Sequence, residues 1–146
     1  MPAPAYTWEF AYDLWGTRVP IKTTLEATSG LFTKEGTLLF MSSGQLDNAT
    51  AATSTMIGLA AEIIDSSATA TDPVDVWLIA PGMVIRGTAD ADASALAGFN
   101  GKTIDLNSNQ TLDVGASSGC LSVHRTEDSG LTVYCVITEF DMGCVN

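Results

Sequence analysis

Short apolar runs, each separated from the next by turn residues at intervals of about 8 to 12 positions, extend through most of this chain of 146 residues. In the segment 74–86, two such runs flank the pair Pro81-Gly82, which suits a tight turn. The segment 121–137 repeats the design around a turn at 127–130. This spacing is typical of antiparallel sandwiches and barrels, so we predict an all-β fold, a small antiparallel β-barrel or β-sandwich.

The same strand pattern predicts the core, with the alternate apolar side chains pointing inward and Trp77 as the largest of them. A second turn is expected at Ser43-Gly44, after the apolar run 38–41. The segment 53–64 suits a strand or a mixed segment, and 92–100 has room for one helical turn.

The start of the chain is rich in aromatic residues. Between positions 6 and 12, every second residue is aromatic and the others are small or polar, which predicts a strand with one aromatic face. We divide the chain into an extended N-terminal arm or first strand (1–28), a β-barrel domain (29–140) and a C-terminal tail (141–146).

Two interpretations of this aromatic segment remain open. As the first strand of the barrel, it would place its aromatic side chains in the core of its own chain. As an arm outside the barrel, it would dock on another chain, either along a sheet edge or in a groove. The prolines near the start and the break at 15–20 favour the arm, with Arg18 facing an acidic neighbour. The predicted partner-binding residues are Tyr6, Trp8, Phe10, Tyr12, Trp15 and Arg18.

Charge and hydropathy exclude several classes of partner. The chain has 17 acidic and 6 basic residues, a formal net charge of -11, and such a surface repels phosphate, so we expect no nucleic-acid partner. No apolar run approaches the roughly 20 residues of a membrane-spanning helix, so we expect no membrane contact. The start lacks a basic region followed by an apolar block, which indicates synthesis in a cytoplasm without a secretory signal.

The cysteine and acidic motifs predict no metal and no cofactor. The three cysteines, Cys120, Cys135 and Cys144, have no CxxC spacing, and one histidine is too few to complete a structural zinc site. We expect reduced, mostly buried thiols, while a disulfide between Cys120 and Cys135 stays open. The segment 90–94 resembles the first half of a calcium loop, but the required Gly and Glu do not follow at the sixth and twelfth positions.

One motif is compatible with hydrolysis. The segment 115–119 reads GASSG and places Ser117 in the nucleophile position, with His124 and Asp128 downstream. That motif requires a strand-to-helix elbow, and this segment lies between two strand-like runs with no helix after it. We expect a flexible corner at this position, a solvated or partner-facing His124, and no enzymatic activity.

Several strand-and-turn segments, taken in order, resemble a known family. "GTLLFMSSGQLDNA", "MIGLAAEII", "DPVDVWLIAPGMVIRG" and "GFNGKTIDLNSNQTLDVG", followed by the closing hairpin, are similar to the small β-barrel decoration, or cement, proteins of tailed bacteriophage capsids. The resemblance covers roughly residues 36 to 139 and consists of strand and turn patterns. It departs from the family at Thr103-Ile104, where an aromatic residue often precedes the Asp-Leu pair.

The resemblance implies a structural virion protein on the outer capsid surface, made in the host cytoplasm. Such proteins commonly bind the expanded shell of the major capsid protein as homotrimers, at three-fold or quasi-three-fold sites, and stabilise it against internal DNA pressure. The alternative is a β-sandwich module that binds a small ligand or a carbohydrate through exposed aromatic residues, with Trp8 and Trp15 as candidates.

Overall fold

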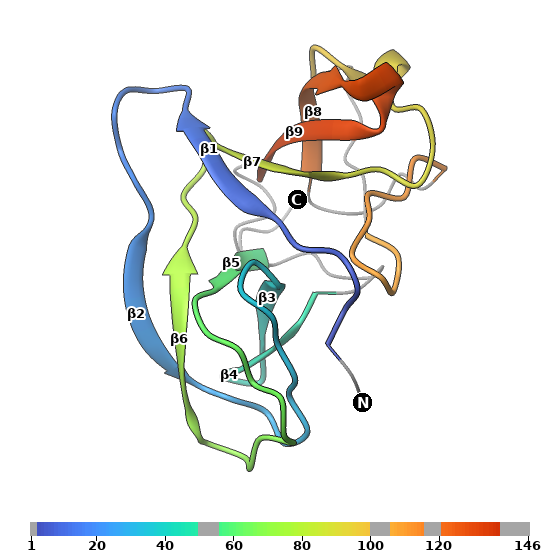
Figure 1. The fold of residues 1–146 in the computed structure, drawn as a ribbon. Coiled ribbons are helices and arrows are strands. Elements are labelled where there is room, and N and C mark those ends of the chain that lie inside the picture. Colours follow the sequence, from blue (N-terminus) through green and yellow to red (C-terminus); the bar gives the residue numbers. More distant parts are fainter. Residues whose placement is uncertain (1–2, 50–55, 100–105, 116–120, 138–146) are drawn as a thin grey trace.

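Two antiparallel β-sheets pack against each other in the computed structural model, which describes residues 3–49, 56–99, 106–115 and 121–137 (Figure 1). The prediction of an all-β fold is confirmed, and the packed sheets form a β-sandwich. The strands are β1 (Glu9–Asp13), β2 (Ile21–Glu26), β3 (Leu38–Ser42), β4 (Gln45–Asn48), β5 (Met56–Ala60), β6 (Pro73–Leu78), β7 (Met83–Thr88), β8 (Leu121–Glu127) and β9 (Thr132–Ile137).

The four-stranded sheet has the order β1-β7-β9-β8, and the five-stranded sheet has the order β2-β6-β5-β3-β4. Two short 3-10 turns, η1 (Ser94–Leu96) and η2 (Asp128–Gly130), complete the described elements. The expected helical turn in 92–100 is therefore the 3-10 turn η1. The segment 53–64 contributes β5, and its first three residues, like the tail 141–146, lie outside the described residues.

Turn chemistry explains the tight hairpin between β3 and β4. Ser43 and Gly44 form its two-residue loop, with φ angles of 51° and 81°, and Ser42 pairs with Gln45 on either side of it. Positive φ at both loop positions is typical of the type I′ turn, whose twist matches that of the flanking strands. The turn expected from the sequence at this position is confirmed.

Two separate clusters of buried side chains hold the sandwich together. The first lies between the sheets and includes Leu38 and Leu59 of the five-stranded sheet together with Ile85 and Cys135 of the four-stranded sheet. The second cluster uses the opposite face of the five-stranded sheet, as the alternation of side chains along each strand requires. Its buried members are Ala27, Leu31, Leu39, Leu46, Ala60, Ala68, Val74 and Val76.

The largest side chain of the first cluster is Trp8, which is 3% exposed. The sequence-based choice of Trp77 was wrong, because Trp77 is 40% exposed. Trp77 lies on β6, next to the edge strand β2, and pairs there with Lys22. Trp8 is covered by contacts with Gly87 and Gln110, which lie far from it in the sequence, so the sequence pattern does not show which tryptophan is buried.

A β-bulge interrupts the alternation along β1. Phe10 pairs with Ile85 and Tyr12 with Val84, so Ala11 is an extra residue on β1. A bulge of this kind shifts the following side chains to the other face of the sheet. Phe10 therefore packs against the cluster between the sheets, whereas Tyr12 packs on the outer face, and the prediction of a single aromatic face was wrong.

Candidate binding surface

Trp8 belongs to the core of its own chain. Its indole Nε1 donates a buried hydrogen bond of 2.7 Å to the carbonyl oxygen of Gln110, and its backbone N–H donates to the carbonyl of Gly36 at 2.8 Å. Gly87 of β7 lies directly against the indole, since a Cβ at that position would come within 2.3 Å of a ring atom. Trp8 is only 3% exposed, so little of its surface is accessible.

The side chain of Gln110 connects its own segment, 106–115, to β3 and to Ala49. Its Oε1 accepts from the backbone N–H of Leu38 at 2.7 Å, and its Nε2 donates to the carbonyls of Leu38 at 2.8 Å and Ala49 at 3.1 Å. Gln110 is fully buried, and these bonds satisfy its amide on both sides. The network connects the segment before β1 to β3 and to the 106–115 segment.

The loop between β1 and β2 is held by the carboxylate of Asp13. Its Oδ2 accepts from the Nε of Arg18 at 2.8 Å and from the Arg18 backbone N–H at 3.1 Å. Its Oδ1 accepts from the Nη2 of Arg18 at 2.8 Å and from the backbone N–H of Trp15 at 3.2 Å. The Arg18 guanidinium, together with these backbone donors, holds the pKa of Asp13 well below its usual range.

Arg18 makes several contacts within its own chain, although its side chain is 40% exposed. Besides its bidentate pairing with Asp13, its Nη2 donates to the carbonyl of Pro81 at 2.7 Å, and its guanidinium carbon lies 5.1 Å from the ring centre of Trp15. The sequence-based interpretation assigned this charge to an acidic neighbour, whereas the structure pairs it with Asp13. The Trp15 ring also packs on Gly82, where a Cβ would come within 2.6 Å of it.

Four apolar side chains along this loop and at the start of β2 are exposed. Trp15 is 66% exposed and Ile21 is 70% exposed, and Leu14 and Val19 are exposed beside them in the sequence. We refer to Leu14, Trp15, Val19 and Ile21 as the apolar loop surface. The sequence analysis selected only Trp15 of these four residues. Leu14, Val19 and Ile21 could have been noticed because they are apolar residues beside a turn, where polar residues are usual.

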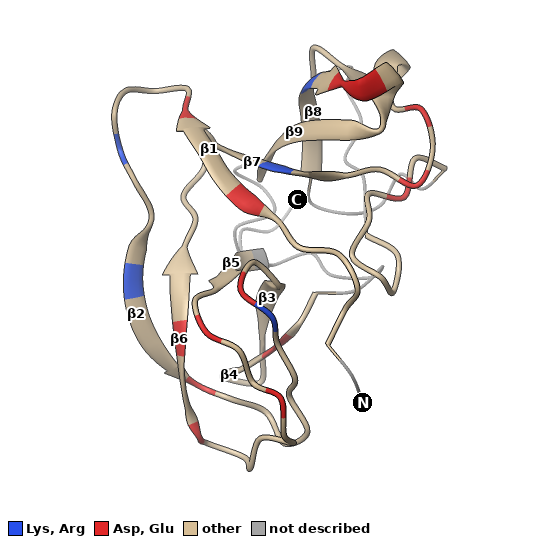
Figure 2. Cartoon of the chain, in the orientation of Figure 1, with Lys and Arg blue, Asp and Glu red and all other residues tan. Residues whose placement is uncertain are grey.

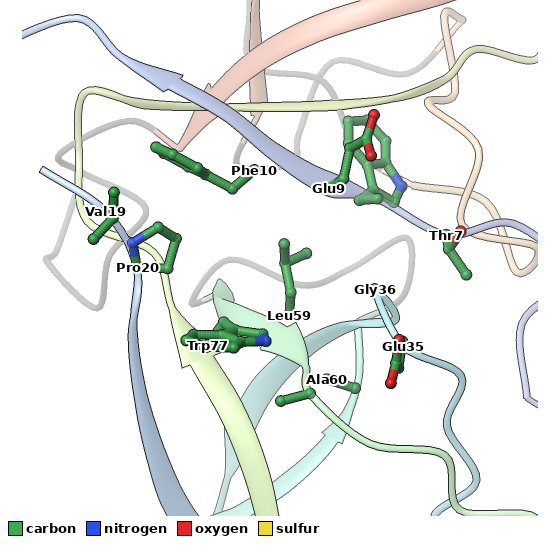
Figure 3. A pocket seen from close by; sticks show the side chains of 12 residues that line it. Thr7, Glu9, Phe10, Val19, Pro20, Glu35, Gly36, Leu59, Ala60 and Trp77 are labelled. Carbon is green, nitrogen blue, oxygen red and sulfur yellow. The ribbon is translucent and has the colours of Figure 1, made fainter. Parts of the chain in front are cut away.

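A cavity of about 720 Å³ adjoins this loop between the two sheets (Figure 3). Phe10 lies on one side of it and Trp77 on the other, while Leu59 points between them and Val19 and Pro20 close one end. The ammonium of Lys22 lies 5.6 Å from the ring centre of Trp77. The lining is thus mainly apolar, with Glu9 and Glu35 at its border.

Tyr12 contributes to a different surface, the outer face of the four-stranded sheet. It stacks on Tyr134 with ring centres 6.2 Å apart, and its hydroxyl accepts from the Nε of Arg125 at 3.0 Å. Arg125 lies 3.7 Å from the ring centre of Tyr134 and also pairs with Glu127 at 2.7 Å. A second bulge, between Val123 and Arg125 on β8, brings the Arg125 side chain to the outer face of the sheet.

The six predicted contact residues therefore lie in several different places. Trp8 is in the core, Phe10 lines the cavity, Tyr12 is on the outer face, and Trp15 and Arg18 form part of the loop. Tyr6 is exposed, and its backbone N–H donates to the carbonyl of Asn109 at 3.2 Å. Whether any of them contacts another chain stays a prediction. Acidic residues are distributed over loops and strands of both sheets (Figure 2).

The residues of the rejected chemical motifs have structural contacts. His124 stacks on Phe99 at 5.2 Å, and Asp128 accepts from the hydroxyl of Thr132 at 2.7 Å. Ser117, Cys120 and Cys144 lie outside the described residues. Cys135 is a free, buried thiol, and burial raises its pKa above the usual range. Across the described ranges, no group of three or more His, Cys, Asp or Glu residues is arranged to hold a metal ion.

Comparison with known proteins does not identify a family, because neither a family model nor a curated protein matches the chain. Among the residues described, no helix has the length and apolar character needed to cross a membrane.

Proposed function

We propose that this chain is a non-enzymatic structural protein that decorates the outside of an expanded tailed-phage capsid by binding the major capsid protein. The strand-and-turn resemblance over roughly residues 36 to 139 supports this proposal, and so does the β-sandwich fold. The family resemblance also implies homotrimers at three-fold or quasi-three-fold positions, where they stabilise the shell against internal DNA pressure.

The observation that carries the proposal is the apolar loop surface. Tryptophan is enriched among residues that dominate protein–protein binding energy, and Trp15 is 66% exposed, with three further exposed apolar residues close to it in the sequence. Asp13 and Arg18 fix the loop before any partner arrives. Binding therefore costs little ordering of the loop, which favours affinity.

Co-sedimentation with undecorated expanded capsids tests this proposal. Deleting residues 1–16 is unsuitable, because it removes Trp8 from the core as well as Trp15 from the surface. Trp15→Ala removes only the exposed ring, and Leu131→Ala is its matched control, since Leu131 is exposed on the turn before β9. Binding that falls in Trp15→Ala and persists in Leu131→Ala supports the proposal; equal binding by both variants argues against this surface.

A second candidate function is binding of a carbohydrate or small ligand, which the cavity between the sheets favours. Its volume of about 720 Å³ is within the usual range for ligand sites, and Trp77 offers a partly exposed ring at its wall. Because Trp8 is buried, Trp77 replaces it as the candidate contact residue. Tryptophan fluorescence titrations with oligosaccharides test this function: a saturable change that Trp77→Ala abolishes supports it, and no change with any sugar removes it.

A further inference from the structure

The cavity between the two sheets has an apolar end and an acidic end. Figure 3 shows the rings of Phe10 and Trp77 on opposite sides of one part of it, with Val19 beside them. Glu9 and Glu35 lie toward the other end. A cavity divided in this way matches a ligand that has an apolar body and a charged or polar group at one end.

The alternation of side chains along β5 and β6 builds one wall of the cavity. Leu59 pairs with Trp77, so both side chains point from the same face of the five-stranded sheet. Leu59 is 4% exposed and belongs to the cluster between the sheets. Trp77 is 40% exposed although β6 is an interior strand, so part of its ring is an accessible aromatic surface in the wall.

The Trp77 ring already contacts a cation of its own chain. Lys22 is its cross-strand partner on β2, and the Lys22 ammonium lies 5.6 Å from the ring centre. Aromatic faces attract positive charge through their quadrupole, and tryptophan does so most strongly. Because Lys22 is exposed, its side chain can move off the ring without opening the core. A cationic ligand would therefore compete with Lys22 for this ring.

The charged side chains that line the cavity are acidic. Glu9 pairs with Arg86 at 2.9 Å, so part of its charge is already balanced. Glu35 is exposed and makes no ion pair with any residue that the structure describes. Among those residues, the lining contains no Lys or Arg, and Lys34, the neighbour of Glu35 in the sequence, is not part of it. Charge complementarity therefore favours a positive ligand over a negative one.

We propose that this cavity binds an organic cation with a flat aromatic body, an arylalkyl ammonium ion. The body packs between Phe10 and Trp77, and the ammonium group is attracted by the Glu35 carboxylate and by the Trp77 ring. The proposal rests on the second candidate function, ligand binding in the same cavity, and is independent of the capsid proposal. Neutral and anionic ligands of the same shape are its alternatives.

Three compounds with the same indole ring separate the effect of charge from that of shape. Tryptamine carries an ammonium group, tryptophol a hydroxyl and indole-3-acetate a carboxylate. The carboxylates of the cavity are solvent-exposed, which weakens their attraction, so we expect a dissociation constant on the order of 1 mM for tryptamine. Tryptophol should bind about fivefold more weakly, and indole-3-acetate should bind most weakly.

NMR titration of the isotope-labelled full chain measures these affinities and locates the site. Saturable shifts are expected at the backbone amides of Gly36, Ala60 and Ala61 and at the Trp77 indole, which line the cavity. Equal affinities for tryptamine and tryptophol, or tighter binding of indole-3-acetate, would overturn the cation preference and leave ligand binding in place. If none of the three compounds gives saturable shifts at these positions, both fail for this class of ligand.

A pair of charge variants tests the role of Glu35. Glu35→Gln should weaken tryptamine binding about threefold and leave tryptophol binding unchanged. Glu26→Gln is the matched control, because it makes the same change at an exposed residue of β2 outside the lining. The chain has a net charge of -11, so equal loss in both variants would show a general attraction to the acidic surface and overturn the site.

Lys22→Met tests the competition for the Trp77 ring. The substitution keeps the apolar stem and removes the ammonium group, so tryptamine should bind about threefold more tightly while tryptophol binding is unchanged. Unchanged or weaker tryptamine binding would refute the assignment of the cation to this ring. Circular dichroism checks that each variant is folded, and capsid binding is measured separately, so either proposal can fail alone.

Discussion

The contact between Gly87 and Trp8 provides a quantitative test of how the N-terminal segment joins the core. In Gly87→Ala, the new Cβ would come within 2.3 to 2.5 Å of three atoms of the Trp8 ring, which has no flexible end that could move aside. Overpacking of this kind costs about 1 to 3 kcal/mol. It is partly offset by the about 0.5 to 1 kcal/mol that alanine gains over glycine in a strand. We expect a net loss of about 0.5 to 2 kcal/mol in the free energy of unfolding.

A double-mutant cycle isolates this contact from other effects. Trp8→Leu removes the ring and its hydrogen bond to Gln110, and should itself cost somewhat less than the about 3 to 5 kcal/mol of a full truncation to alanine. In that background Gly87→Ala has no ring to meet, so it should become neutral or stabilising. The coupling free energy between the two positions should therefore be about 1 to 3 kcal/mol.

Urea unfolding followed by far-ultraviolet circular dichroism measures the four free energies of this cycle. The reasoning is refuted if Gly87→Ala destabilises the Trp8→Leu background as much as the original chain, because the clash would then not involve the indole. It is also refuted if both single variants are neutral, which would place Trp8 outside the folded core.

Two further expectations follow from the titrating groups. Asp13 has a lowered pKa in the folded chain, so the loop contacts contribute stability above the unfolded value of about 3.9 and lose it as pH falls through the folded value. The Trp15 side-chain signals in NMR spectra should stay unchanged from pH 7 to pH 5 and shift only in strong acid. Asp13→Asn should shift the same signals at neutral pH. If Asp13→Asn leaves them unchanged, the Asp13 carboxylate does not hold the loop. Cys135 has a raised pKa in the folded chain. Its protonated thiol therefore contributes fully to the stability of the fold below the unfolded pKa of about 8.5, and this stability is lost as pH rises above that value. In the Cys120→Ser, Cys144→Ser background, iodoacetamide at pH 8 should therefore modify Cys135 only after denaturation, and rapid modification of the folded chain would show that the site is open.

The strand content and several turns could be predicted from the sequence. The alternation of apolar and polar residues along a strand, and the residues that adopt positive φ in a turn, depend only on neighbouring positions in the chain. The turn at Ser43-Gly44 is an example, since its conformation follows from the two residues that form it. The aromatic face of β1 could not be predicted, because one extra residue at Ala11 reverses the side of every residue after it. That bulge depends on the partner strand β7, which lies about 70 positions away in the sequence.

The candidate surface was predictable only in part. Trp15 could be selected because it is an aromatic residue next to a turn. The pairing of Asp13 with Arg18 could not be predicted, because it depends on how the loop between them folds back. Trp8 precedes the edge strand β1 and is buried, whereas Trp77 lies on the interior strand β6 and is 40% exposed, so strand order alone does not decide between them. The contacts that cover Trp8 come from Gly87 and Gln110, which lie far away in the sequence.

Saturation binding to undecorated expanded capsids of the virus that encodes the chain is the most direct test of the proposed function. We expect the full chain to saturate at a fixed ratio to the major capsid protein. Trp15→Ala should bind about 30-fold more weakly, as loss of about 2 kcal/mol at a central tryptophan requires, while circular dichroism shows it to be folded. No saturable binding by the full chain, with intact shells and folded protein, would contradict the capsid proposal and leave the cavity as the better candidate for a binding site.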